Sequence, residues 1–301
     1  MACALPKDGP VLPIPCRCLV GRSPGADWQI QDSNVSHEHA SIWWDGEGWW
    51  IRDLGSRNGT RVDGNPIKPG IQVRLSRGQR LEFGGHSYQL SDLSPPEALA
   101  RNLVHKTWRK AQSGLLVLPD DDNPELTLFR GIDDQWRAET DRDVSHPVEQ
   151  QVVVTGTQAF RLFLPVPLKG TTVMEALPMI EDVRLELRHS TDMEHIEAYA
   201  NAGTTRHDLG ARAHNYLLLV LAQRRLEDHQ NGTPDSDCGW VYQDELETMI
   251  HASRKTLNLH VFRVRRALCD LRVDGGAGII ERRSGNNQIR IGISEITIST
   301  L

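Results

Sequence analysis

Three short polar clusters between residues 21 and 60 constrain this 301-residue chain more than any other feature. They are Gly21-Arg22-Ser23, then Ser36-His37-Glu38-His39-Ala40, then Gly55-Ser56-Arg57-Asn58-Gly59-Thr60. Runs rich in apolar, aromatic and β-branched residues separate the clusters. This alternation predicts strands with polar loops at their ends, where binding groups usually lie on a rigid sheet.

One pair of these runs predicts a β-hairpin. Ser41–Trp44 and Trp49–Arg52 are both strand-like, and Asp45-Gly46-Glu47-Gly48 joins them. An Asp-Gly turn between two such runs is a strong local signal for a hairpin. Later strands are predicted at Gln72–Leu75, Arg80–Phe83 and Ser87–Leu90. Residues 1–9 are predicted to form a loose leader, and Ser94-Pro95-Pro96 predicts the end of the domain.

The ordered series Gly-Arg, Ser-x-x-His and Asn-Gly resembles the signature of the forkhead-associated (FHA) domain. The resemblance covers residues 10–93. It implies an all-β sandwich that binds phosphothreonine peptides, and therefore a threonine-phosphorylated partner protein. The ordered spacing carries the resemblance, because each dipeptide alone would be uninformative.

The residue types of the clusters suit phosphate recognition. A phosphothreonine carries close to two negative charges and three acceptor oxygens. Arg22 offers a planar fork of donors, and the Ser36 hydroxyl can donate to another oxygen. The family implies that Asn58 grips the peptide backbone. Arg57 either adds charge to the site or points to solvent. The predicted phosphopeptide-binding residues are Arg22, Ser36, His37, Arg57 and Asn58.

Three further residues of the clusters are predicted to be structural. Gly21 and Gly59 permit backbone angles that a side chain would forbid. The family implies that His39 braces the loops. His37 and His39 lack a third ligand at suitable spacing, so no metal site is predicted, and no cofactor is expected.

Composition sets the expected compartment and excludes some functions. The net charge is −6, so the whole molecule is not an obvious nucleic-acid binder. Five cysteines without a Cys-x-x-Cys pair fit a reducing cytoplasm. The N-terminus does not resemble a signal peptide, and no apolar run approaches the ~20 residues of a membrane span. Phosphate-loop, zinc-helix and nucleophile-elbow motifs are absent, so we expect no enzyme.

The interval 97–168 is predicted to be a β-rich middle domain. Glu125–Phe129, a polar turn and Gln135–Ala138 faintly repeat the first hairpin. The interval is either a degenerate FHA-like copy or an unrelated small β domain. In either case it lacks the three clusters, so we predict no second phosphate site. Residues 166–178 contain several prolines and glycines and are predicted to form a linker.

Residues 182–295 are predicted to form an α+β domain with a basic third helix. Strands are expected at Val183–Leu187 and His195–Tyr199, helices from near Ala211, at Gln243–His251 and at Arg254–Leu271, and a hairpin over 278–291. This order resembles the winged helix-turn-helix effector domain of OmpR-type response regulators. The best match is the stretch from Thr256 to Leu268.

That resemblance implies binding to double-stranded DNA. Arginines concentrate on the third helix and hairpin of an otherwise acidic chain, which is the footprint expected of a DNA contact. By resemblance, the third helix presents Lys255, Asn258, Phe262 and Arg263 to the groove. Arg265 and Arg266 would hold phosphates. Arg282 or Arg283 would serve the wing. Asn258 has a second reading, in which it caps or braces the helix.

Together these features predict a cytoplasmic, bacterial transcriptional regulator that reads a phosphothreonine and binds DNA. The alternative is a phospho-dependent adaptor whose winged helix docks a protein, since that fold also serves as a protein interface. A third hypothesis is self-regulation, in which the FHA domain binds a phosphorylated Thr171 or Thr172 of the same chain.

Overall fold

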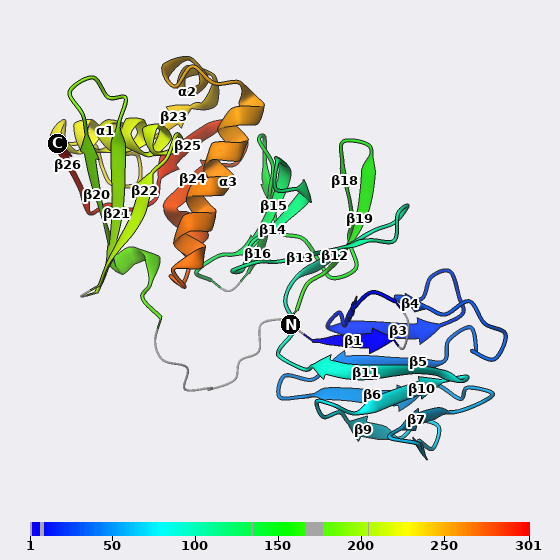
Figure 1. Ribbon diagram of the computed structural model, residues 1–301. Coiled ribbons are helices and arrows are strands. Elements are labelled where there is room, and N and C mark those ends of the chain that lie inside the picture. Colours follow the sequence, from blue (N-terminus) through cyan, green and yellow to red (C-terminus); the bar gives the residue numbers. More distant parts are fainter. Residues whose placement is uncertain (1, 7–8, 134, 166–176, 204) are drawn as a thin grey trace. The chain divides into compact units, whose positions relative to one another are not determined.

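The computed structural model describes residues 2–6, 9–133, 135–165, 177–203 and 205–301. Two compact units are present (Figure 1). The first comprises Met1–Lys110, Glu149–Val152 and Arg161–Gly170, and the second comprises Ala111–Val148, Val153–Phe160 and Thr171–Leu301. The predicted linker at 166–178 lies outside the described residues apart from Leu177 and Pro178, and so do Thr171 and Thr172.

Two β-sheets form a sandwich in the first unit. One has the strand order β2-β1-β11-β10-β7-β8 and the other β4-β3-β5-β6-β9. The core is built by alternation, since Leu81 and Phe83 of β10 are fully buried while Arg80 is exposed. The strands are β1 Cys3–Pro6, β2 Leu12–Pro13, β3 Arg17–Gly21, β4 Trp28–Gln29, β5 Ala40–Trp44, β6 Trp49–Asp53, β7 Thr60–Val62, β8 Asn65–Pro66, β9 Gln72–Arg74, β10 Arg80–Phe83 and β11 His86–Asp92.

The predicted hairpin is confirmed. Strands β5 and β6 pair antiparallel, with Trp44 opposite Trp49. The Asp45 carboxylate accepts the backbone amides of Glu47 and Gly48, both at 2.9 Å, and so closes the turn. The three later strands are confirmed as β9, β10 and β11.

The prediction of a loose leader at residues 1–9 is wrong. Strand β1 pairs with β11, and Ala4 lies opposite Leu90. Ala2 and Ala4 are fully buried, so this edge of the sandwich is part of its core. Small side chains and Pro6 gave the segment no visible strand pattern, and only the partner strand reveals it.

The interval 97–168 forms two four-stranded sheets instead of one middle domain. One has the order β13-β12-β19-β18, and the other has the antiparallel order β14-β15-β16-β17. Residues up to Lys110 belong to the first unit, whereas Ala111–Val148 belong to the second. The strands are β12 Leu99–Asn102, β13 Trp108–Lys110, β14 Leu116–Asp120, β15 Asn123–Arg130, β16 Trp136–Glu139, β17 Val144–Ser145, β18 Val152–Thr155 and β19 Gln158–Phe163.

The second unit joins the β14–β17 sheet to a helical C-terminal part. This part contains one sheet of order β22-β21-β20-β26 and a smaller sheet of order β23-β25-β24. Strands β20, β21 and β22 come before the helices in sequence, whereas β26 is the last strand of the chain. The elements are η1 Ile180–Asp182, β20 Val183–His189, β21 Ile196–Ala202, β22 Thr205–Ala211, α1 Asn215–Gln230, β23 Val241–Tyr242, α2 Gln243–Met249, α3 Arg254–Asp270, η2 Gly276–Ile279, β24 Ile280–Arg283, β25 Gln288–Ile291 and β26 Ile296–Thr300.

The predicted helices and hairpin are confirmed, but three strands were missed, namely β22, the two-residue β23 and β26. Helix α3 begins where the Ser253 hydroxyl accepts the amide of Thr256. One apolar face of α3 is buried in the core of this unit, namely Leu257, Val261, Val264 and Leu268. Strand β22 is largely polar in sequence. Strand β26 lies beyond the predicted domain boundary at residue 295 and pairs in parallel with β20.

Candidate functional site

The three polar clusters of the first unit meet at one set of loops. The first follows β3, the second precedes β5, and the third lies between β6 and β7. The Arg22 amide donates to the Ser36 carbonyl at 2.9 Å. The Arg57 amide donates to Oγ of Ser36 at 3.0 Å. The sandwich therefore brings together residues that are widely separated in sequence, as the resemblance implies.

Arg22 is held in place with much of its donor capacity unused. Its Nε donates to the Val35 carbonyl at 3.2 Å. Within the described part of the chain, its terminal nitrogens have no hydrogen-bond or ion-pair partner. A guanidinium anchored through Nε with two free N–H edges is suited to an oxyanion with several acceptor oxygens.

Ser36 and Asn58 present complementary groups beside Arg22. Because Oγ of Ser36 accepts the Arg57 amide, its own proton is available for a ligand. The Asn58 side-chain amide donates to the Asn34 carbonyl at 2.8 Å. That contact orients Asn58 and leaves its carbonyl oxygen available to accept a hydrogen bond.

His39 braces the loops from inside. It is fully buried, its Nδ1 accepts the Ser36 amide at 3.1 Å, and its Nε2 lies 3.2 Å from the Gly59 carbonyl. An accepting Nδ1 and a donating Nε2 define the neutral imidazole. Burial lowers the pKa of His39, which is consistent with that neutral form.

Asp53 fixes the third loop, a role that the sequence analysis did not assign to it. Its carboxylate accepts the amides of Gly55 and Ser56 at 2.8 and 2.9 Å, and the Thr60 hydroxyl at 2.6 Å. Burial raises its pKa, but hydrogen bonds from Ser56 and Thr60 outweigh burial and hold the pKa below its ordinary value.

Two glycines are required by close backbone approach. A Cβ on Gly21 would lie 2.1 Å from the His37 carbonyl oxygen. Gly84, in the turn before β11, has φ +57°, and its Cβ would lie 2.6 Å from the Asn34 carbonyl oxygen. Gly59 has φ +75°, in the left-handed region that favours glycine.

A shallow hollow of about 260 Å³ lies beside Asn58. Its walls include Asn34, Gly59, Arg61 and Gly85. Arg61 was not among the predicted site residues. His37 and Arg57 are both exposed, and both join the loops through their backbones. The His37 carbonyl accepts the Ser23 amide at 3.1 Å, and the Arg57 amide donates to Ser36.

The predicted DNA contacts divide into exposed and buried residues. Lys255 and Arg263 are exposed on α3 and have no ion pair with any residue that the structure describes. Phe262, Arg265 and Arg282 are not presented to a DNA groove in this structure, because Phe262 and Arg265 are 6% and 1% exposed and the Arg282 side chain is 6% exposed. Asn258 accepts a hydrogen bond from Arg282 at 2.9 Å, which favours its bracing role.

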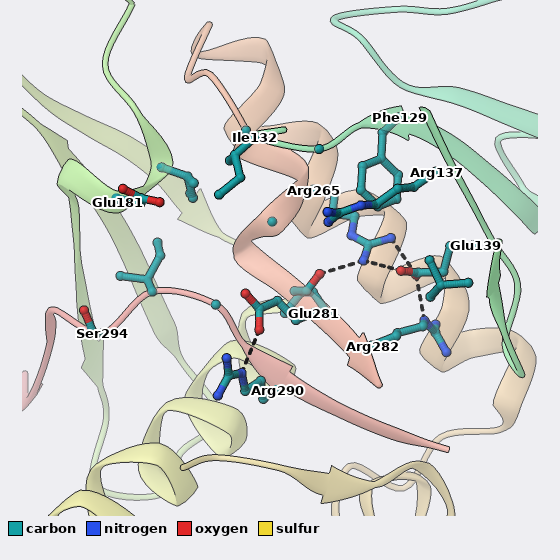
Figure 2. A pocket seen from close by; sticks show the side chains of 18 of the residues that line it. Phe129, Ile132, Arg137, Glu139, Glu181, Arg265, Glu281, Arg282, Arg290 and Ser294 are labelled. Atoms are coloured by element: carbon teal, nitrogen blue, oxygen red, sulfur yellow. Dashed lines mark hydrogen bonds and ion pairs between the residues drawn. The ribbon is translucent and has the colours of Figure 1, made fainter. Parts of the chain in front are cut away.

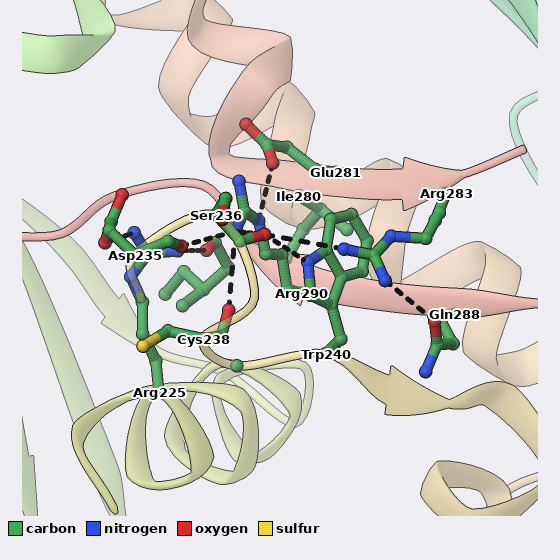
Figure 3. A network of polar contacts seen from close by, with 12 residues as sticks. Arg225, Asp235, Ser236, Cys238, Trp240, Ile280, Glu281, Arg283, Gln288 and Arg290 are labelled. Carbon is green, nitrogen blue, oxygen red and sulfur yellow. Dashed lines mark hydrogen bonds and ion pairs between the residues drawn. The ribbon is translucent and has the colours of Figure 1, made fainter. Parts of the chain in front are cut away.

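The remaining two predicted arginines have intramolecular partners. Arg266 forms an ion pair with Asp270 at 2.9 Å. Arg283 forms an ion pair with Asp237 at 3.2 Å and lies 4.3 Å from the centre of the Trp240 ring. Figure 3 shows Arg290 and Arg283 on Trp240, with Glu281 accepting from Arg290. The arginines of this hairpin are thus engaged within the unit.

A basic surface remains around the exposed face of α3. Burial lowers the pKa of His214 to about 4, and the positive charges of His260, Arg263 and Arg212 add to the effect. Arg212 and Arg263 therefore both lie near His214, although sequence reasoning did not select Arg212. Lys255 precedes Arg263 on α3 by about two helical turns. Neither arginine has a carboxylate partner among the described residues. Arg212, Lys255 and Arg263 are called the basic surface below.

The described residues contain no group of three or more His, Cys, Asp or Glu side chains placed to hold a metal ion. None of the helices in the described ranges has the length and apolar character needed to cross a bilayer.

Residues 18–84 match the family pattern of the FHA domain, so the first unit contains an FHA domain with an all-β sandwich fold. The FHA domain-containing protein At4g14490 of Arabidopsis thaliana is 29% identical over 89 residues, which are 30% of this chain and 23% of the relative. FhaA of Mycobacterium tuberculosis is 38% identical over 66 residues, which are 22% of this chain and 12% of that protein. The chain thus spans less than a quarter of these relatives.

Similar solved structures each cover about a third of the chain. The FHA domain of the CT664 protein from Chlamydia trachomatis is 29% identical and covers 31% of this chain and 98% of that one, with a TM-score of 0.28. Mycobacterium tuberculosis EmbR, solved with a low affinity phosphopeptide, is 26% identical and covers 31% of this chain and 25% of that one, with a TM-score of 0.29.

Proposed function

We propose that the first unit binds a phosphothreonine-containing segment of a partner protein. The observation that carries this proposal is the pairing of Arg22, whose terminal nitrogens have no partner among the described residues, with the adjacent Ser36 hydroxyl. Arg22 would bind two phosphate oxygens, and Ser36 would donate to the third. Asn58 would bind the peptide backbone beside the phosphothreonine. The FHA match over residues 18–84 supports the same reading.

Fluorescence anisotropy with a phosphothreonine peptide library tests this proposal on the full chain. Arg22→Ala should reduce binding at least about tenfold, because a hydrogen bond to a charged group contributes about 1.5–3 kcal/mol. Arg74→Ala is the matched control, because Arg74 lies on β9 and contacts the Glu47 carbonyl instead of the site loops. Equal losses in both variants would argue against recognition by Arg22.

We also propose that the second unit binds double-stranded DNA, which would make the chain a phosphothreonine-dependent transcriptional regulator. The basic surface favours this function, since it gathers three cations without a carboxylate partner among the described residues. The order of α1, α2, α3 and the β24–β25 hairpin is compatible with a winged helix-turn-helix. We propose a cytoplasmic location and a role as a binding protein without catalytic activity.

Binding to random duplex DNA across a salt series tests the DNA half. Lys255→Ala and Arg263→Ala should each weaken binding and lower the slope of log affinity against log salt by about one. The runner-up function is a phospho-dependent adaptor whose second unit docks a protein. Absence of DNA binding at low salt, with a protein partner still captured by the second unit, would favour the adaptor.

A further inference from the structure

Helix α3 has a second buried face, which packs on the β14–β17 sheet instead of on the C-terminal core. Cys269 clusters with Leu115 and Phe129. The Arg265 guanidinium lies 4.8 Å from the centre of the Phe129 ring. At the end of the helix, the Ser113 hydroxyl donates to Asp270 at 2.6 Å. This is the face on which Phe262 and Arg265 were expected to meet DNA.

One buried carboxylate holds the two arginines of this face. Glu139 of β16 accepts Nη1 and Nη2 of Arg265 at 2.7 and 2.9 Å. It also accepts Nε of Arg282 at 2.8 Å. Figure 2 shows Glu139 between the two guanidinium groups. The side chains of all three residues are 6% exposed or less.

The loop after β16 also contacts α2 and the β24–β25 hairpin. The Asp141 carbonyl accepts the Gln243 side-chain amide at the start of α2, at 2.8 Å. The Ser284 hydroxyl, at the end of β24, donates to the Asp143 carboxylate. The segment from Glu139 to Asp143 therefore touches α2, α3 and the hairpin, the three elements of the proposed DNA-binding domain.

The chemistry of the contact resembles the chemistry of a phosphate contact. A carboxylate that accepts two parallel N–H groups of an arginine presents the same geometry as two phosphate oxygens. Burying one carboxylate with two guanidinium groups leaves a net positive charge. Such clusters specify an arrangement more than they stabilise it. A polyanion is therefore suited to replace Glu139.

We infer that the β14–β17 sheet is an intramolecular cover that competes with duplex DNA for α3 and β24. In the closed state Glu139 occupies the place of a DNA phosphate. In the open state Arg265 and Arg282 are released and join the basic surface in binding DNA. This inference rests on the proposed DNA-binding function and adds its regulation.

Glu139→Gln in the full chain tests the cover, because it removes the charge and keeps the shape. Asp133→Asn is the matched control, since Asp133 lies in the loop before β16 and its carboxylate pairs with Arg137 at 3.1 Å instead of with an arginine of α3 or β24. Affinity for a random-sequence duplex should rise on the order of tenfold in Glu139→Gln, within the usual range for coupled equilibria. Its salt slope should steepen by about one to two. Asp133→Asn should match the wild type.

Hydrogen exchange supplies a readout that does not depend on a variant. Adding DNA to the wild type should speed amide exchange in β15 and β16, because the sheet separates from α3. Unchanged exchange there, or equal DNA affinity of Glu139→Gln and wild type, would overturn the cover and leave the DNA-binding proposal intact. If neither protein binds DNA at low salt while peptide binding persists, the DNA-binding proposal fails and the cover fails with it.

Discussion

The backbone amide of Arg57 donates a hydrogen bond to Oγ of Ser36 at 3.0 Å, and this bond joins two loops of the FHA domain. The contact fixes the Ser36 oxygen while leaving its proton available. A single hydroxyl thus both orders the third loop and offers a donor to a phosphate. The same geometry makes Ser36 the most informative position for separating recognition from stability.

Ser36→Ala should weaken binding of a phosphothreonine peptide by about tenfold or more, because the hydroxyl bonds a charged group in the complex. The free energy of unfolding should fall by only about 1 kcal/mol, since one hydrogen bond to the Arg57 amide is lost. Calorimetry with one peptide and denaturant unfolding measure the two effects. Ser33→Ala, at an exposed position in the loop before β5, should leave both unchanged. An unaltered affinity in Ser36→Ala would remove Ser36 from the site.

Gly21→Ala should destabilise the first unit by about 2–3 kcal/mol, the scale of forced overpacking. Its Cβ would be placed 2.1 Å from the His37 carbonyl, which belongs to backbone that cannot move freely. Gly25→Ala is the control, because the nearest other atom to its Cβ is Oγ of Ser23 at 3.7 Å. Denaturant unfolding followed by tryptophan fluorescence reports on this unit. Equal stability of the two variants would contradict the packing described for Gly21.

The first unit should lose stability as pH falls below about 6.5, the ordinary pKa of histidine. Burial lowers the pKa of His39 in the folded state, so below 6.5 the unfolded state binds more protons. The folded state is then disfavoured until pH reaches the lowered pKa. His39→Asn should flatten the dependence of the melting temperature on pH between 5 and 7, because the titrating group is gone. An identical slope in both proteins would show that His39 is not responsible.

Much of the FHA site could be predicted from sequence because its signals are local. Arg22, Ser36 and Asn58 follow or precede strong strand runs, and strand ends place such residues in neighbouring loops. Asp53 was missed because its role depends on amides and hydroxyls that converge only when the loop folds. Strand β1 was missed because pairing with β11 creates it.

The burial of Arg265 could not be predicted, because its partner lies far away in sequence. Leu257, Val261, Val264 and Leu268 recur at helical spacing, and all four lie in the core. Periodicity says nothing about a second partner surface, and Glu139 is separated from Arg265 by 126 positions. Arginine side chains are most often exposed, so an exposed Arg265 was the natural expectation. Arg265 is buried instead because the carboxylate of Glu139 is buried beside it.

The most direct measurement is calorimetry of the full chain with its best library peptide before and after phosphatase treatment. Arg22 and Ser36 are expected to bind the phosphate itself, so removing it should reduce the affinity by at least about a hundredfold, the effect of losing several charge-assisted hydrogen bonds. Equal affinities for the phosphorylated and dephosphorylated peptide would contradict phosphothreonine recognition by this domain.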